Sequence, residues 1–172
     1  MIKPYTAVGL IPTVRGIRTR ADIAVNLENL RHLVKAAAWL SCLELPVRLI
    51  ALPEGALQGF NDEVLDLDHV QFARECAIDI PGPETDELGV IARQYNAFVM
   101  GQAKARHPDW KDRFFNVGFI LDRSNARARD LEKVLVRMKP DRAGAQVPAK
   151  TRFTSPCTAV PTKNSGLVEV QN

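Results

Sequence analysis

Short apolar runs alternate with segments of helical periodicity along the first 122 residues of the chain. The apolar runs predict four strands, at residues 6–11, 47–52, 98–103 and 114–122. Between residues 23 and 43, apolar side chains recur at every third or fourth position, which predicts a long amphipathic helix. A shorter helical segment is expected at residues 69–76.

The clearest helix start follows the turn residues Pro81-Gly82-Pro83. Thr85 is a candidate N-cap, and the apolar spacing that follows predicts a helix as far as residue 97. Strands and helices then alternate until the last two strands, which follow each other directly. This order predicts an α/β fold whose sheet is covered by helices on at least one face.

Length and composition favour one soluble domain. The chain has 172 residues, of which 46% are hydrophobic and 25% charged, as in ordinary globular proteins. It contains neither an apolar run of the roughly 20 residues that span a bilayer nor the apolar segment of a signal peptide. Its three cysteines are widely spaced, without a CxxC pair, which argues against a disulfide framework or a structural zinc site. We therefore expect a cytoplasmic protein.

Several chemical classes lack their usual motifs in this sequence. The three histidines have no metal-ligand spacing, so no metal site is expected. Neither a GxGxxG nor a Walker pattern occurs, so no nucleotide cofactor is expected. A Gly-x-Ser-x-Gly elbow is also missing, which argues against a serine hydrolase.

Charge and composition change after Asp122. Residues 1–122 contain 13 basic and 16 acidic side chains, whereas residues 123–172 contain ten basic and four acidic ones. We therefore predict a folded part at 1–122 and an irregular, basic segment at 123–172. The segment could bind an acidic partner such as nucleic acid. Alternatively, it is a truncated or divergent tail that does not belong to the preceding fold, and this makes nucleic-acid binding the less favoured interpretation.

Glu54 is the strongest candidate for chemistry. It follows the predicted strand at 47–52 and begins a loop that contains Gly55 and Gly59. In α/β proteins, ligands and catalytic groups gather at the carboxyl ends of the strands. A carboxylate at such a position can serve as a general base. From this segment alone, a solvated Glu at a strand end is the favoured interpretation, and the rest of the sequence changes this balance.

Four blocks of the sequence resemble the nitrilase superfamily, the carbon–nitrogen hydrolases. They are the first strand with its helix near Asn26, Leu52-Pro53-Glu54 with Gly59-Phe60, Gly82-Pro83-Glu84-Thr85 with Leu88 and Ile91-Ala92, and residues 113–122. The resemblance covers about residues 5–122. It implies the N-terminal half of a four-layer α–β–β–α sandwich and assembly into dimers or larger homo-oligomers.

The resemblance also implies a reaction and its residues. Members of this family hydrolyse small nitriles or amides with a Glu base, a Lys and a Cys nucleophile, without a cofactor. Glu54 matches the base, Lys133 lies at a suitable distance for the Lys, and Cys157 is the cysteine downstream of it. Gln58 and Phe60 are expected near the mouth of the substrate pocket.

The candidates for Lys and Cys depart from the family pattern. Residues 126–133 are typical of a helix rather than a strand, and Cys157 lacks the expected apolar and acidic neighbours. Cys42 and Cys76 fall in helical segments and are expected to be buried and inert. Two hypotheses follow: an active carbon–nitrogen hydrolase, or a catalytically inactive fragment, which as a basic-tailed protein could bind an acidic partner.

Overall fold

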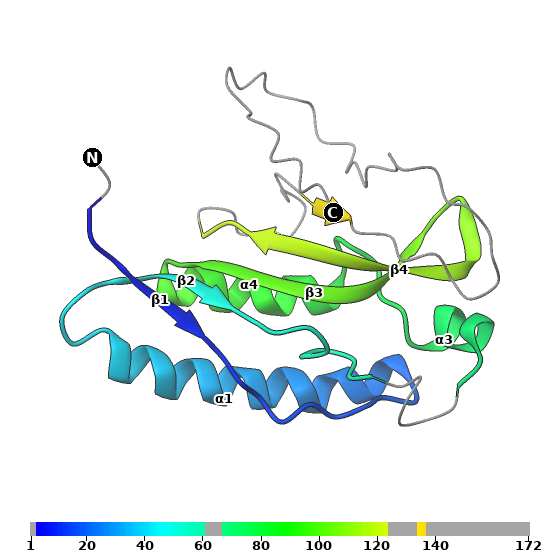
Figure 1. Ribbon diagram of the computed structural model, residues 1–172, viewed down its shortest axis with the longest axis horizontal. Helices are drawn as coiled ribbons and strands as arrows, with labels where there is room; N and C mark the ends of the chain where they lie inside the picture. Colours follow the sequence, from blue (N-terminus) through cyan, green and yellow to red (C-terminus); the bar gives the residue numbers. More distant parts are fainter. Residues whose placement is uncertain (1–2, 61–66, 124–133, 137–172) are drawn as a thin grey trace, which may run out of the picture.

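The computed structural model describes residues 3–60, 67–123 and 134–136 (Figure 1). Its strands are β1 (Thr6–Gly9), β2 (Val47–Ala51), β3 (Phe98–His107), β4 (Trp110–Leu121) and β5 (Val134–Val136). Its helices are the 3-10 helix η1 (Arg20–Asp22), α1 (Ile23–Ser41), α3 (His69–Glu75) and α4 (Pro83–Tyr95). The α/β class predicted from the alternation of elements is confirmed.

The sheet has the strand order β1-β2-β3-β4-β5. The first three strands are parallel, whereas β3 pairs with β4, and β4 with β5, in antiparallel orientation. Because β1, β2 and β3 run in the same direction, their carboxyl ends meet at one edge of the sheet, on the right in Figure 1. The N-terminal end of α1 lies at this same side, and its C-terminal end lies at the opposite side.

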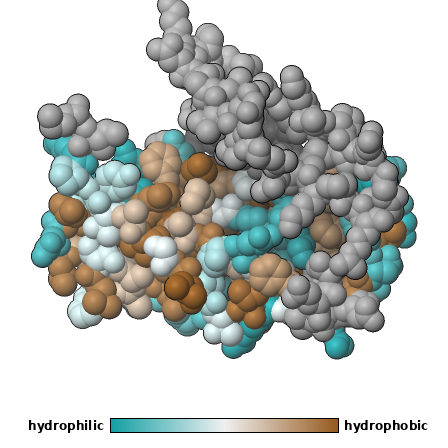
Figure 2. Space-filling view, in the orientation of Figure 1, coloured by the Kyte–Doolittle hydropathy of each residue, from teal (hydrophilic) through white to brown (hydrophobic). Residues whose placement is uncertain are grey.

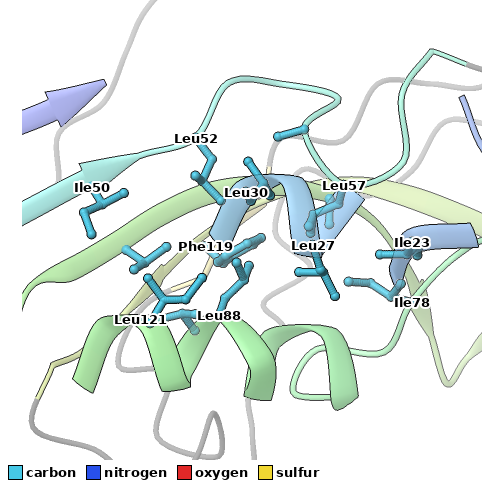
Figure 3. Close-up of a cluster of buried hydrophobic side chains, with 14 of the residues drawn as sticks. Ile23, Leu27, Leu30, Ile50, Leu52, Leu57, Ile78, Leu88, Phe119 and Leu121 are labelled. Carbon is cyan, nitrogen blue, oxygen red and sulfur yellow. The ribbon is translucent and has the colours of Figure 1, made fainter. Parts of the chain in front are cut away.

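Helices α1 and α4 cover one face of the sheet and form the core with it (Figures 1 and 3). Leu27 and Leu30 of α1 and Leu88 of α4 meet Ile50 of β2 and Phe119 of β4, and all five side chains are buried. The helical periodicity of the sequence therefore marks the side of α1 that packs on the sheet.

The other sheet face is more exposed to solvent. Met100 of β3 and Ile120 of β4 are register partners and are 40% and 38% exposed, whereas their neighbours Val99 and Leu121 are buried. The described residues thus form one helix layer and one sheet layer, which are two of the four layers implied by the family resemblance. Among these residues, no helix is both long and apolar enough to cross a membrane.

Several boundaries differ from the expectations. Strand β4 begins at Trp110 instead of residue 114, because its polar first residues extend a hairpin with β3. Helix α4 has Gly82 as its N-cap and Pro83 in its first turn, so Thr85 lies inside the helix. The Thr85 hydroxyl accepts a hydrogen bond from the Gly82 N–H at 2.9 Å and thereby still stabilises the helix start. The helix expected at 126–133 lies outside the described residues.

Candidate functional site

Glu54 lies in the loop that follows β2, at the carboxyl end of the parallel strands. The Leu52 N–H donates to the Met100 carbonyl at 2.8 Å, so the loop leaves the sheet directly beside β3. Gly55 then takes a φ of +77°, a conformation that favours glycine. The turn leaves Glu54 exposed, while residues 55–59 are buried. An exposed carboxylate on a buried loop combines access for a ligand with a fixed backbone.

A chain of side-chain amides orients the Glu54 carboxylate. Asn116 of β4 donates from Nδ2 to Glu54 Oε1 at 2.8 Å. Gln102 of β3 donates from Nε2 to Asn116 Oδ1, and its own Oε1 accepts the Gly55 N–H at 3.1 Å. This series of hydrogen bonds begins and ends in the loop of Glu54. Strands β3 and β4 therefore fix both the backbone of the loop and the Glu54 carboxylate.

Asn26 fixes the same loop from the side of α1. Its side chain is buried, and Nδ2 donates to the carbonyls of Leu57 and Arg15 at 2.8 and 3.0 Å. Gly59 has a φ of +66°, and a Cβ at this position would lie 2.6 Å from the Gly16 Cα. The two loops that follow β1 and β2 are therefore packed backbone against backbone, which requires glycine at the contact.

Gln58 and Phe60, the two predicted pocket residues, lie in this loop. Gln58 is buried. Its Oε1 accepts the Lys104 N–H at 2.6 Å, and its Nε2 donates to the Lys104 carbonyl at 2.9 Å. It also donates to the Cys76 carbonyl at 2.8 Å. Phe60 is 38% exposed, and its ring lies against Gly55. Contact of either side chain with a substrate stays a prediction, and the structure assigns the Gln58 amide to backbone hydrogen bonds.

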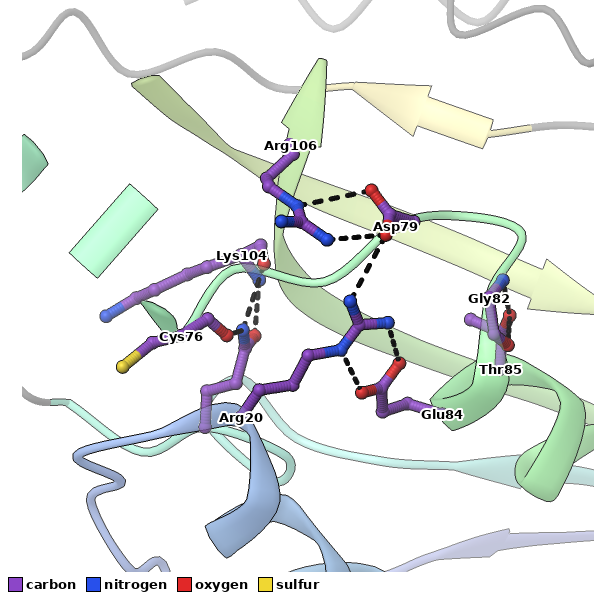
Figure 4. A network of polar contacts seen from close by, with 9 residues as sticks. Arg20, Cys76, Asp79, Gly82, Glu84, Thr85, Lys104 and Arg106 are labelled. Atoms are coloured by element: carbon purple, nitrogen blue, oxygen red, sulfur yellow. Dashed lines mark hydrogen bonds and ion pairs between the residues drawn. The ribbon is translucent and has the colours of Figure 1, made fainter. Parts of the chain in front are cut away.

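An ion-pair network joins η1 to α4 and β3 (Figure 4). Arg20 binds the buried Glu84 carboxylate through two hydrogen bonds of 2.5 and 2.8 Å, and contacts Asp79 at 3.2 Å. Asp79 also accepts from Arg106 at 2.6 Å. The bonds to Glu84, with help from Asp79, raise the pKa of the Arg20 guanidinium. Both acids are paired, so this network stabilises the surroundings of the site and offers no further base.

The two thiols among the described residues, Cys42 and Cys76, are poor candidates for the nucleophile. Cys42 is the C-cap residue of α1 and is exposed, which corrects the expectation that it is buried in the helix. Its Sγ lies 3.4 Å from the Trp39 carbonyl. Cys76 is fully buried as expected, and burial raises the pKa of its thiol from 9.0 to about 11. Neither thiol has the properties of a nucleophile for Glu54. Lys133 and Cys157 lie outside the described residues.

A groove lies among the described residues at the end of α1 that is distant from Glu54. It has a volume of about 680 Å³ and is lined by residues from the second half of α1, the start of β2 and the end of α4, among them His32, Trp39, Cys42 and Tyr95. Apolar surface gathers at this end, over β1 and the second half of α1, in the left half of Figure 2. The described residues hold no group of three or more His, Cys, Asp or Glu that could bind a metal ion.

Comparisons with known proteins concern most of the chain. The family model of carbon–nitrogen hydrolases matches residues 10–155, a range that contains Glu54 and Lys133 but ends before Cys157. No curated protein matches the sequence. Among solved structures, Nit3 of Saccharomyces cerevisiae, a member of branch 10 of the nitrilase superfamily, is similar with a TM-score of 0.52. It is 16% identical over 75% of this chain and 43% of its own.

Two further solved structures are similar. An N-terminal amidase has a TM-score of 0.51 and 10% identity, over 72% of this chain and 26% of its own. XC1258 of Xanthomonas campestris, a CN-hydrolase superfamily protein, has a TM-score of 0.46 and 21% identity, over 73% of this chain and 38% of its own. This chain therefore spans less than half the length of these structures. At such identities, the likeness of Nit3 and the amidase shows a common fold.

Proposed function

The chain belongs to the carbon–nitrogen hydrolase family, and we propose that it hydrolyses a small nitrile or amide with Glu54 as the general base. The carboxylate oriented by Asn116 at the carboxyl ends of the strands carries this proposal. Glu54 is accessible from solvent, and its hydrogen bond to an amide donor fixes one oxygen while the other can exchange a proton.

The resemblance supplies the remaining roles. A Cys thiol, with Cys157 as the candidate, gives its proton to Glu54 and attacks the amide carbon. Glu54 returns the proton to the leaving ammonia, and a thioester remains. Glu54 then takes a proton from water, which attacks the thioester; the carboxylic acid leaves, and Glu54 returns the proton to the Cys sulfur. Lys133 is the candidate cation for the negative charge that develops on the substrate oxygen in both steps.

Ammonia release tests this proposal. The panel comprises the parent chain, Glu54→Gln, Lys133→Met, Cys157→Ala and the matched control Cys42→Ala, each at the same soluble concentration with small nitriles and amides. We expect turnover by the parent and by Cys42→Ala, and a loss of about 10²–10⁴-fold for Glu54→Gln. Retention of activity in Glu54→Gln would overturn the assignment of the base.

A second candidate is a catalytically inactive member of the same family. It is favoured by the thiols, because neither Cys42 nor Cys76 suits the nucleophile and the family match ends before Cys157. In this case the basic segment 123–172, with ten basic and four acidic residues, is the candidate contact for an acidic partner. A folded parent that releases no ammonia, but binds polyanions with a steep salt dependence, would support this alternative.

A further inference from the structure

The second half of α1 carries apolar side chains on its solvent-exposed side. Trp39 and Leu40 are 72% and 63% exposed, and Leu43, in the turn after the helix, is 78% exposed. Ala36 is exposed too, and its spacing of three and four residues places it beside Trp39 and Leu40 on the helix surface. Adjoining apolar side chains mark interaction sites more often than single ones do. These four residues form the α1 ridge.

The groove of about 680 Å³ lies beside the α1 ridge and follows the helix. Its lining takes every third or fourth residue of α1 and of the C-cap that ends it, namely His32, Ala36, Trp39 and Cys42. Such spacing extends over about ten residues, or about 15 Å of helix. The backbone groups of α1 are bonded within the helix, so they are not available to an added strand. An elongated hollow beside a helix therefore suits a second helix.

The charge of the groove is positive. Lys35 and Arg48 belong to its lining, and the described lining residues include no Asp or Glu. Lys35 is exposed and has no ion-pair partner in the part of the chain that the structure describes. Arg48 donates from Nη1 to the Asn96 carbonyl at 3.0 Å, a neutral acceptor that leaves the charge of the guanidinium uncompensated. Glu44, the acid next to the α1 ridge in the sequence, is not part of the lining.

Charge and shape distinguish the occupants that this surface could have. Residues 123–172 contain ten basic and four acidic side chains, so they would add to the positive charge. A symmetric contact of two copies would bring both Lys35 and both Arg48 side chains to one interface without an acid from the lining. An anionic bilayer would compensate these cations, but a flat lipid surface makes no use of a hollow. A protein with acidic and apolar side chains fits both the charge and the shape.

We propose that the α1 ridge and the groove form a docking surface for an acidic amphipathic helix of another protein. Apolar side chains at positions i, i+3, i+4 and i+7 of this helix enter the groove and cover Trp39 and Leu40. Its flanking Asp or Glu side chains pair with Lys35 and Arg48 through charge-assisted hydrogen bonds. The docking surface lies at the end of α1 that is distant from Glu54, so the contact is independent of the proposed reaction.

Designed peptides test the proposal. The probe is a stapled, fluorescently labelled helix of about 15 residues, with Leu at the four apolar positions and Glu on the flanks. Two matched peptides carry Lys in place of Glu, or Ser in place of Leu. Fluorescence anisotropy measures their binding to the parent, Trp39→Ala and Lys35→Glu. Val90→Ala on α4 and Lys111→Glu on β4 are the controls, because both residues are exposed and lie outside the docking surface.

We expect the parent to bind the acidic peptide and neither matched peptide. Trp39→Ala and Lys35→Glu should each weaken this binding at least about tenfold, with both controls unchanged. Lys35→Glu should also bind the Lys peptide more tightly than the parent does, an effect that a purely structural role of Lys35 would not produce. Circular dichroism verifies that each variant is folded.

Three results would overturn the proposal. The first is a parent that does not bind the acidic peptide, or binds it as well after Trp39→Ala and Lys35→Glu. The second is binding to phosphatidylserine vesicles that Trp39→Ala abolishes, without binding of the peptide, which would assign the surface to a membrane. The third is a dimer of the parent, seen by light scattering, that Trp39→Ala dissociates and the peptide does not, which would assign the surface to a second copy.

Discussion

The two ends of α1 differ in what they offer a ligand. At its N-terminal end, Asn26 holds the loop of Glu54, and a chain of amides orients the carboxylate. At its C-terminal end lies the groove, with a solvent-accessible thiol, Cys42, and a histidine, His32. His32 is paired with Glu28 at 3.2 Å, and Cys42 lies 3.4 Å from a carbonyl within the same helix.

We infer from this comparison that polar groups from several elements meeting at one point identify the site better than the volume of a groove does. Polar groups from β3, from β4 and from the loop after β2 meet at Glu54, although they are far apart in the sequence. The groove brings a cysteine and a histidine to one surface, but their polar contacts are local. We therefore expect substitutions at the Glu54 end to have large effects and those at the groove end to have small ones.

The largest effect on stability is expected for Gly59→Ala. The new Cβ would require a positive φ and would lie 2.6 Å from the Gly16 Cα. We expect a loss of about 2–4 kcal/mol in the free energy of unfolding, measured in urea. Gly89→Ala in α4 is the control, because its Cβ would meet only the Arg93 side chain at 3.6 Å. It should stabilise the protein by up to about 1 kcal/mol, and the same sign for both would contradict the account.

Asn26→Leu should have the next largest effect. It removes both hydrogen bonds that connect α1 to the carbonyls of Leu57 and Arg15. An unsatisfied buried carbonyl costs about 1–3 kcal/mol, and the loop of Glu54 loses its support. Ala36→Leu, at an exposed position of the same helix beside the groove, should change stability by less than about 0.5 kcal/mol. Urea unfolding of both variants measures the difference, and equal values would show that the two ends are equivalent.

The two described thiols should differ in reactivity. Cys42 is exposed, whereas Cys76 is buried and has a pKa raised to about 11. With iodoacetamide at pH 8, peptide mapping should find Cys42 alkylated and Cys76 unmodified in the folded protein. Modification of Cys76 at a rate like that of Cys42 would show that the core beneath Gln58 opens.

The same shift predicts a pH dependence of stability. Because the folded protein raises the pKa of Cys76, its thiol favours folding below pH 9, and this contribution is lost as the pH rises from about 9 to 11. Cys76→Ala should lack this part of the alkaline loss. Unfolding curves of parent and variant at pH 8 and pH 11 provide the comparison, and parallel losses would contradict the shift.

The smallest effect on stability is expected for a substitution in the apolar surface at the groove end. Leu43 is 78% exposed, so Leu43→Ser removes little buried area and should change the free energy of unfolding by less than about 0.5 kcal/mol. A loss above about 1 kcal/mol would show that a partner or another segment covers this surface.

The strands and helices up to residue 122 could be predicted because their periodicity reflects which side is buried. Residues 110–113 were missed as part of β4, since their polar side chains carry no apolar alternation. Thr85 is an N-cap candidate in the sequence because a Thr follows the turn residues, but Pro83 places the first turn earlier, and the Thr85 hydroxyl bonds the N-cap residue Gly82. Cys42 was expected in the apolar side of a helix that ends one residue before it.

For the site, Glu54 was predicted from its place after a strand, and its catalytic role stays a prediction. Its partners Asn116 and Gln102 gave no signal of their own, because an amide in a strand is ordinary and the contact depends on strand register. Asn26 and Gln58 likewise bind backbone carbonyls that no pattern in the sequence identifies. Lys133 and Cys157 lie outside the described residues, so their roles and the boundary at 122 also stay predictions.

The central claim is that a small amide binds at the Glu54 end of the sheet. It is tested most directly by ¹H–¹⁵N NMR of the Cys157→Ala variant, titrated with propionamide so that turnover through this thiol is blocked. The account predicts shifts of the Gly55 amide and of the side-chain NH₂ groups of Gln102 and Asn116, with the Trp39 indole N–H unchanged. Shifts at Trp39 and Cys42, without changes at Gly55 and Asn116, would place the ligand in the groove and contradict it.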